Sequence, residues 1–418
     1  MMRWLEKEAS DRFLDLVSSI NFHSQRIYGT DLVLADYPAR EASLKTLDGM
    51  WEAIEDVEPE ISRLDGDKCE YLKAMLEGIR MIVRVMQGDE VPYTDQIAAM
   101  QQIESHMVSD DQIRALSEIL EKELTELGYR ENGVGAKTLK FLSDYALEPE
   151  EVVPTVSRFL AASKERTSRL VFEIPEESEI SDVTGVRGVV YNANSGYLGN
   201  FKGRLSFNID RPWSLPTFAN ILCHEGYPGH HAFYGRWDTL FREGKLPCEA
   251  AFYIKNTPTN ALFEGVPESG LHILGWDDPE ADTPEIAEKD KKIFLAGRKV
   301  QDLQRMYQQN GCHMVNVEGA SKEDAVSYMM GSGLFQLREA EGACRFFTDA
   351  TRRTYYNSYY YGRWMVRNAY RLFPEERRQE FFRLTYDRPH TTNTYIKCIA
   401  EALGRDWNPY ETEGCEKQ

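Results

Sequence analysis

Three of the eight histidines in this chain fall within eight residues, at His224, His230 and His231. Glu225 follows His224 directly. In the zinc motif H-E-x-x-H, two histidines on one helix bind the metal and the glutamate acts as general base on a metal-activated water. The cluster therefore points to metal-assisted hydrolysis, with Glu225 as the base.

The spacing of this cluster differs from that motif. The position four residues after His224 is Pro228, which cannot bind a metal, so His230 becomes the expected second ligand. On an unbroken helix six residues rotate by about 600° and rise by about 9 Å, which would separate the two rings. Pro228-Gly229 predicts a break that brings them together, because proline interrupts a helix and glycine accepts unusual dihedral angles. A straight helix through 224–231 would exclude the site.

A third ligand is expected from the segment Ala261–Glu268. It offers Glu264 and Glu268, whose spacing puts them on one helix face. Glu264 is our first choice and Glu268 stays open. Two nitrogens and one carboxylate oxygen suit a single Zn²⁺ per chain. Cys223 adjoins His224 but lies on a different face, so we expect it to pack in the core.

The hydroxyl-rich segment Tyr355–Arg363 is expected to supply a donor that stabilises the oxyanion. Tyr360 and Tyr361 are the first choices, and His390 is another. Most of these tyrosines are expected to serve helix packing.

Substrate contacts are expected from arginines and from one strand. Arg338, Arg353 and Arg363 could bind a substrate carboxylate, which would indicate a carboxypeptidase, although ordinary ion pairs explain them equally well in an acidic protein. Asn208 and the strand 204–210 could pair with an extended peptide by strand addition. This feature favours peptides over other amides or esters.

The elements that must position these residues are mostly helices. Apolar residues recur at helical spacing through 1–175, an N-terminal helical region. A catalytic region follows at 176–418. It begins with a small sheet at 176–212, in which Val186–Tyr191 is predicted as a strand from its β-branched and aromatic residues, and 204–210 from its alternation of apolar and polar residues. Helices resume with Ser214 as N-cap, and a long one is expected from Thr283-Pro284 to Asn310-Gly311. Others cover 321–330, 334–349, 354–371, 374–386 and 391–403.

The predicted fold is therefore mainly α, a large multi-helix unit with a small β-sheet beside the active-site cleft. The two regions are expected to form one compact unit of 418 residues.

Net charge and composition limit the classes of binding partner that we expect. The formal net charge is −19, which disfavours nucleic acid and anionic membranes. No apolar run approaches the length of a membrane span, and charges appear within the first residues, so neither a span nor a signal peptide is expected. Seven scattered cysteines suit reduced thiols, and the predicted location is cytoplasmic.

The segment His-Glu-x-x-Pro-Gly-His-His resembles the signature of a large family, domain of unknown function 885, which is grouped with the thermolysin-like zinc metallopeptidases (gluzincins). Phe207-Asn208, Glu264-Gly265 and Tyr361-Gly362 with Arg363 are similar to looser motifs of that family, so the resemblance covers about residues 186–400. It implies a mainly helical metallopeptidase-like fold with a sheet edge beside the cleft.

Residue by residue, the resemblance implies His224 and His230 as ligands, Glu225 as general base and Glu264 as third ligand. His231 would lie behind the ligands or donate to the transition state. Val266-Pro267 follows Glu264-Gly265 where the family usually has tryptophan and a helix-favouring run.

The expected function is zinc-dependent hydrolysis of peptide bonds, with a carboxypeptidase as one form. Two alternatives stay open: a metallohydrolase of small amides or esters, and a non-catalytic, metal-stabilised helical binding protein. A di-iron carboxylate protein is disfavoured because it needs Glu-x-x-His pairs on two helices, which the sequence lacks.

Overall fold

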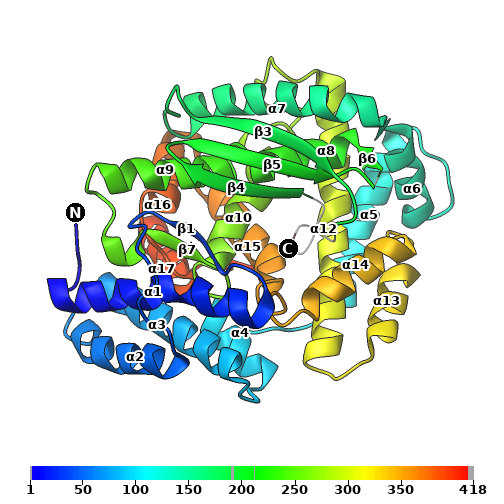
Figure 1. Cartoon of the computed structure of the whole chain (residues 1–418). Helices are drawn as coiled ribbons and strands as arrows, with labels where there is room; N and C mark the ends of the chain where they lie inside the picture. The colour runs from blue at the N-terminus through cyan, green and yellow to red at the C-terminus, as the bar shows by residue number, and fades with distance from the viewer. Residues whose placement is uncertain (1, 190–192, 211, 413–418) are drawn as a thin grey trace.

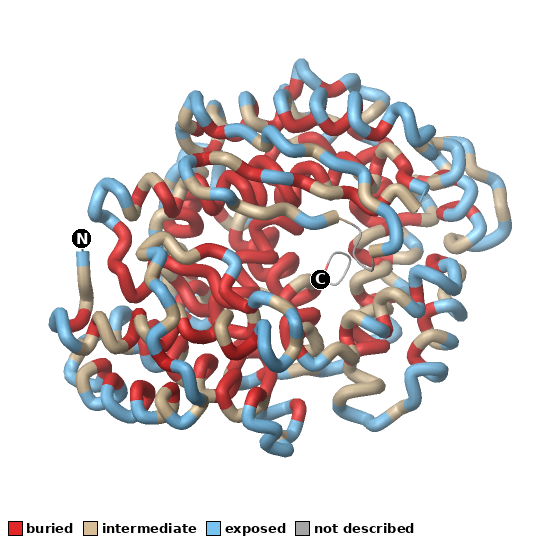
Figure 2. Tube along the Cα trace, in the orientation of Figure 1, coloured by how far each residue is buried: buried red, intermediate tan, exposed pale blue. Residues whose placement is uncertain are grey.

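The computed structural model describes residues 2–189, 193–210 and 212–412. Helices dominate these residues and the strands are few and short, which confirms the mainly α expectation (Figure 1). Buried segments gather in the middle of the molecule, and exposed segments alternate with buried ones around its periphery (Figure 2). No helix in the described part of the chain is both long and apolar enough to cross a membrane.

A three-stranded sheet lies beside the central helices. It consists of β3 (Glu179–Val186), β4 (Ala193–Gly199) and β5 (Lys202–Asn208), in the order β3-β5-β4. Strand β5 runs parallel to β3 and antiparallel to β4. Leu205 and Phe207 alternate toward the interior, where Phe207 contacts Phe218 with ring centroids 5.1 Å apart. The sheet is thereby fixed against the helix that carries His224.

The order of the strands corrects two expectations. Strand β5, expected at 204–210 to pair with a peptide, is the central strand and is already paired on both sides. The free edge on the side of the site belongs to β4, which a sequence with Gly196 and Gly199 did not suggest. The strand expected at Val186–Tyr191 is also misplaced, because β3 ends at Val186; residues 190 and 191 lie outside the described part.

Five helices surround the centre of the molecule. They are α8 (Leu215–Glu225), α9 (His230–Arg242), α10 (Asn260–Glu268), α12 (Glu288–Asn316) and α15 (Asn357–Leu372). Ser214 precedes α8 as its N-cap residue, as expected. Helix α12 begins and ends later than expected, since it continues through Gly311. That glycine lies against Phe347 and Met329, so tertiary packing keeps the helix intact there.

Helices α10 and α15 approach each other through two glycines. A β-carbon on Gly265 would lie 2.2 Å from the carbonyl oxygen of Gly362, and one on Gly362 would lie 2.1 Å from the carbonyl oxygen of Ala261. Only glycine leaves room for backbones at this distance. The contact holds Glu264 and Glu268 of α10 against the side chains of α15.

We expect Gly362→Ala to lower the free energy of unfolding by about 1–3 kcal/mol, because the added methyl group must push two helix backbones apart. Thermal and denaturant unfolding would measure the loss. Gly331→Ala is the matched control: Gly331 also lies in a helix, has open space around it, and should change stability by less than about 1 kcal/mol. Equal stabilities of the two variants would contradict the close helix contact.

The helices between residues 7 and 101 lie at the bottom of the view in Figure 1, and a strand pair joins this part to the rest of the chain. Strand β1 (Val33–Asp36) pairs antiparallel with β7 (Phe252–Ile254). The backbone amides of Trp4 and Leu5 also donate to the buried Glu249. One continuous set of buried apolar side chains extends from the first helix to the last, so residues 1–175 and 176–418 share a core.

The remaining elements complete the shell around this centre. They are α1 (Lys7–Tyr28), α2 (Leu47–Ile61), α3 (Gly66–Gln87), α4 (Tyr93–Gln101), α5 (Asp110–Glu126), α6 (Val134–Asp144), β2 (Ala146–Leu147), α7 (Pro149–Leu170), β6 (Trp213–Ser214), α11 (Gly270–Ile273), α13 (Lys322–Gly331), α14 (Leu337–Phe347), α16 (Arg378–Tyr386) and α17 (Thr392–Leu403), with short 3-10 turns at Cys248–Ala250 and Glu375–Arg377.

Candidate metal centre

The chain breaks its helix between the two histidines, as the spacing predicted. Helix α8 ends at Glu225 and α9 begins at His230, with a cis peptide bond before Pro228 in the connection. A β-carbon on Gly229 would lie 1.9 Å from the carbonyl oxygen of His224, so no larger residue fits there. The sharp reversal places His224 at the end of one helix and His230 at the start of the next.

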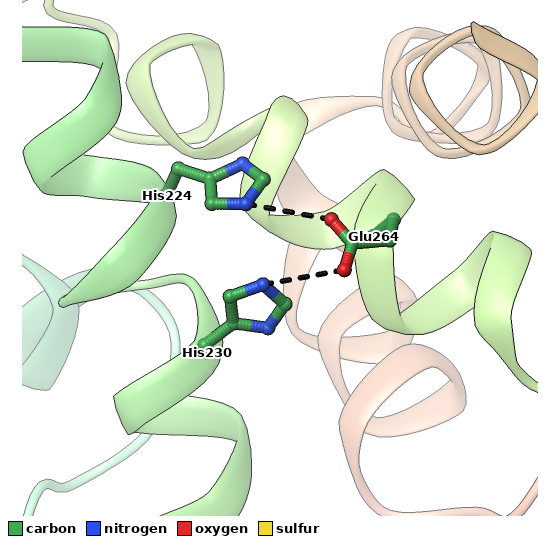
Figure 3. A group of neighbouring side chains, drawn as sticks. All are labelled: His224, His230 and Glu264. Atoms are coloured by element: carbon green, nitrogen blue, oxygen red, sulfur yellow. Dashed lines mark ion pairs between the residues drawn. The ribbon is translucent and has the colours of Figure 1, made fainter. Parts of the chain in front are cut away.

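His224, His230 and Glu264 converge from three helices (Figure 3). The Nε2 atom of His224 lies 3.4 Å from Glu264 Oε2, and the Nε2 atom of His230 lies 3.5 Å from Glu264 Oε1. All three side chains are buried, and their ligand atoms lie within 4.8 Å of one another. This buried group, the three expected ligands, could hold a metal ion.

The surroundings of Glu264 fit that interpretation. The two ring-to-carboxylate distances exceed the 2.7–3.2 Å of a good N–H···O hydrogen bond. Among the described atoms, Glu264 Oε2 has no hydrogen-bond partner, although it is fully buried. The Tyr355 hydroxyl donates to the other oxygen, Oε1. Burial alone would raise the pKa of Glu264, but His230 and His224 hold it well below its usual range, so the carboxylate is charged.

Glu268, the other candidate for third ligand, takes a different place from Glu264. It lies one helical turn further on α10, and its Oε1 atom is 3.5 Å from Nδ1 of His224, on the far side of that ring from Glu264. Metal-binding histidines usually donate their second ring nitrogen to such a carboxylate, which fixes the ring. Glu268 faces the second nitrogen of His224 at 3.5 Å, where it can orient the ring of a metal-bound histidine, and it stands outside the group of three.

Glu268 is itself held by two arginines. Arg305 of α12 pairs with Oε1 at 2.9 Å, and the fully buried Arg363 of α15 pairs with Oε2. Arg363 also pairs with the buried Asp302. The orientation of His224 thus depends on a chain of charges that joins α10, α12 and α15. Arg363, expected to bind substrate, is instead sealed inside this network.

Glu225 and His224 line one cavity of about 210 Å³ beside the centre. The backbone amide of Ser195, on edge strand β4, donates to Glu225 Oε2 at 3.2 Å. This hydrogen bond fixes the side chain while the carboxylate faces the cavity. The other lining residues come from α8, α10, α12, α14 and α15, from the segments just before α14 and α15, and from the start of β4: Ala193, Ile221, Glu268, Gln304, Arg305, Gln308, Phe335, Glu339, Gly342, Ala343, Phe346, Tyr356 and Tyr359.

Tyr359 is the hydroxyl group that the sequence did not single out. Its ring lies 6.4 Å from that of His224, nearly parallel to it, and it lines the cavity. Burial raises the pKa of Tyr359 well above its usual value, and Glu264 raises it further, so the phenol stays protonated and can donate. The sequence clue to Tyr359 was its spacing of four residues from Tyr355, which puts both tyrosine side chains on the face toward Glu264.

The structure leaves four of the expected catalytic and binding side chains away from the cavity. The hydroxyl of Tyr361 accepts from the amide of His106 and donates to the carbonyl of Glu104, and Tyr360 packs against its ring. His231 lies on the opposite side of α9, 3.2 Å from Ser178 Oγ. His390 contacts the carbonyl of Leu384.

The remaining expected substrate contacts are also placed elsewhere. Asn208 is buried at the end of β5, where its amide donates to the carbonyl of Val189 and accepts from the amide of Asp210. Arg338 is exposed and donates to the Asp210 carbonyl. Arg353 donates to Gln96. Cys223 is buried in the core, as expected.

His390 gives a stability prediction with a definite sign. Burial lowers its pKa from 6.5 to about 4. The unfolded chain therefore binds a proton between pH 6.5 and about 4 that the folded chain does not, and stability falls as the pH falls through this window, by up to about 3 kcal/mol from this group. His390→Gln should reduce that loss, measured as the free energy of unfolding at pH 7 and pH 4.5. The exposed His106→Gln variant is the control, and an unchanged pH dependence in His390→Gln would contradict the prediction.

Comparison with known proteins adds information on the fold alone. No protein-family model matches the chain, and no curated protein matches it. A crystal structure is similar, that of the "putative lipoprotein" from Colwellia psychrerythraea, with a TM-score of 0.56 and 13% sequence identity over 93% of this chain and 70% of that chain. At such low identity the likeness extends to the arrangement of the elements and not to the chemistry.

Proposed function

We propose that the chain is a zinc-dependent metallohydrolase that cleaves peptide bonds. One observation carries the proposal: His224, His230 and Glu264 converge from three helices on the side of a cavity that also contains Glu225. The resemblance of the His-Glu-x-x-Pro-Gly-His-His segment to domain of unknown function 885 and to the zinc metallopeptidases supports the same reading.

Zinc suits this set of donors better than a hard cation does. Two imidazole nitrogens and one carboxylate leave a fourth position open, which is typical of catalytic zinc sites. Bonds of about 2.0–2.2 Å in a tetrahedron put neighbouring ligand atoms about 3.3–3.6 Å apart. The two histidine nitrogens lie 3.4 and 3.5 Å from Glu264, each from a different carboxylate oxygen, and the ligand atoms of the group lie within 4.8 Å of one another. Bound there, zinc would polarise a substrate carbonyl and lower the pKa of a water molecule.

The side chains around the proposed zinc site supply the other groups that hydrolysis needs. Glu225 accepts the proton of the attacking water, while the Ser195 amide holds its Oε2 atom. Tyr359 donates its phenolic hydrogen to the carbonyl oxygen as negative charge develops there. Glu268 keeps the His224 ring in place through Nδ1.

Edge strand β4 favours a peptide as the substrate. Its inner side is paired with β5; on its outer side Ala193 lines the cavity and the Ser195 amide donates to Glu225. An extended peptide can add to such an edge through main-chain hydrogen bonds. Short amides and esters could not use the strand, so this edge is what separates the proposal from the alternative of a small-amide hydrolase.

The test is the metal content of the purified wild type and of His230→Ala, by elemental mass spectrometry, followed by peptide hydrolysis. We expect about one zinc per chain in the wild type, loss of the metal in the variant, and peptide cleavage that a chelator abolishes. His106→Ala, which removes a histidine outside the group, should keep its zinc. Zinc without cleavage of any peptide would favour the metal-stabilised binding protein, and no zinc after reconstitution would reject the proposal.

A further inference from the structure

Arg305 stands out among the residues around the cavity. Of the described residues that line it, Arg305 is the only lysine or arginine, in a protein with a formal net charge of −19. It projects from the middle of α12, and its side chain keeps 23% of its surface exposed, whereas Arg363 on the same carboxylate keeps 1%. Arg305 is thus the cation that a molecule in the cavity would meet.

The environment of Arg305 orients it rigidly and leaves donors unused. Its Nη2 atom pairs with Glu268 and its Nη1 atom lies 3.1 Å from Gln308 Oε1. The guanidinium lies 4.6 Å from the centre of the Tyr359 ring, a stacking contact that holds its plane. A guanidinium carries five N–H donors, so at least two remain for a ligand.

We propose that Arg305 binds the terminal carboxylate of a peptide substrate, which makes the enzyme a carboxypeptidase; this inference rests on the proposed function. The guanidinium matches a carboxylate in shape and charge. Tyr356 lines the cavity next to Arg305 and supplies a neutral hydroxyl to the same subsite. The substrate class is peptides with a free C-terminus.

The position of Arg305 relative to the metal group fits the removal of one terminal residue. One oxygen of Glu268 lies 2.9 Å from Arg305 Nη2 and 3.5 Å from Nδ1 of His224, the ring nitrogen that faces away from Glu264, so the guanidinium lies close to one ligand ring. One residue of extended chain spans about 3.3–3.6 Å. A carboxylate on Arg305 would therefore lie within a residue or two of the His224 ring, which favours cleavage near the end of the peptide over cleavage far inside it.

Burial keeps the second member of this subsite neutral. It raises the pKa of Tyr356 to about 12, an effect that the Arg305 guanidinium partly opposes. A protonated phenol can donate to a carboxylate without repelling it. Glu339 also lines the cavity but from α14, and Arg305 makes its ion pair with Glu268 and not with Glu339.

The experiment compares two pools of acetylated tetrapeptides that differ only at the C-terminus, one ending in a free carboxylate and one in an amide. Wild type, Arg305→Gln, Arg305→Lys and the control Arg338→Gln are assayed, and the zinc content of each is measured. We expect the wild type to cleave the acid pool on the order of 100-fold faster than the amide pool. Arg305→Gln should lose that preference with its zinc retained, and Arg305→Lys should keep part of it.

The following results decide whether Arg305 binds the terminal carboxylate. Equal cleavage of both pools by the wild type, or an equal loss on both pools in Arg305→Gln, would overturn it while leaving the proposed function intact. If the wild type cleaves neither pool, the proposed function fails, and calorimetric binding of the two pools becomes the deciding measurement. Peptide binding that requires the free carboxylate, and that weakens in Arg305→Gln but not in Arg338→Gln, would support the carboxylate subsite without the hydrolytic function. If peptide binding does not depend on the free carboxylate and on Arg305, the subsite is rejected.

Discussion

Replacing Glu225 with glutamine is expected to lower kcat for peptide hydrolysis by about 10²–10⁴-fold, the contribution typical of a positioned general base. Glutamine has nearly the same shape and can still accept the hydrogen bond of the Ser195 amide. It cannot accept a proton from water. Because Glu225 lies outside the group of three ligands, the zinc content should stay at the wild-type level.

Glu339→Gln is the control for this measurement. Glu339 is a carboxylate in the same cavity, on α14, and it contacts none of the three ligands. We expect its kcat to stay within a few-fold of the wild type. Full activity in Glu225→Gln, with zinc bound, would show that another group accepts the proton; loss of zinc would show that Glu225 belongs to the ligand set.

Arg363→Met should have the largest effect on stability. Arg363 is fully buried between Glu268 and Asp302, and its removal takes one partner from each carboxylate. Glu268 keeps Arg305, and Asp302 keeps Arg298 and Arg367. Breaking a buried ion pair from one side costs about 3–5 kcal/mol. The variant should also bind zinc about 10- to 100-fold more weakly, because Glu268 then holds the His224 ring less firmly.

Arg338→Met serves as the comparison, since Arg338 is exposed and makes one hydrogen bond to a backbone carbonyl. It should change the free energy of unfolding by no more than about 0.5 kcal/mol. Chemical denaturation with zinc present and absent separates the two effects of Arg363→Met. A variant that unfolds like the wild type would mean that the charge network stabilises the fold less than its burial suggests.

Much of the metal centre could be predicted because its local sequence allows few backbone conformations. A proline and a glycine between two histidines leave little besides a reversal, and the structure has one at Gly226–Gly229. The four-residue spacing of Glu264 and Glu268 placed both on one face, as observed. Amphipathic periodicity likewise located most helices within a few residues of their observed bounds.

The predictions that failed concerned features that depend on how an element packs against its neighbours and not on the sequence pattern of the element itself. Tyrosines occupy several faces of α15, so periodicity could not separate Tyr359, which lines the cavity, from Tyr360 and Tyr361, which do not. Strand order depends on long-range pairing, and the glycine-containing β4 gave no sign that it would form the edge. Arg305 is one of many charges on α12, and only the packing of Glu268 distinguishes it.

The pairing of β1 with β7 bears on how the chain is made. A ribosome delivers Val33 long before its partner Ile254, so the first strand must wait for more than half of the protein to emerge. Glu264 follows shortly after β7, and Tyr355, which holds its carboxylate, follows later still. The proposed metal centre therefore cannot assemble on a chain that ends before Tyr355, and a nascent or truncated copy of that length would lack a complete site.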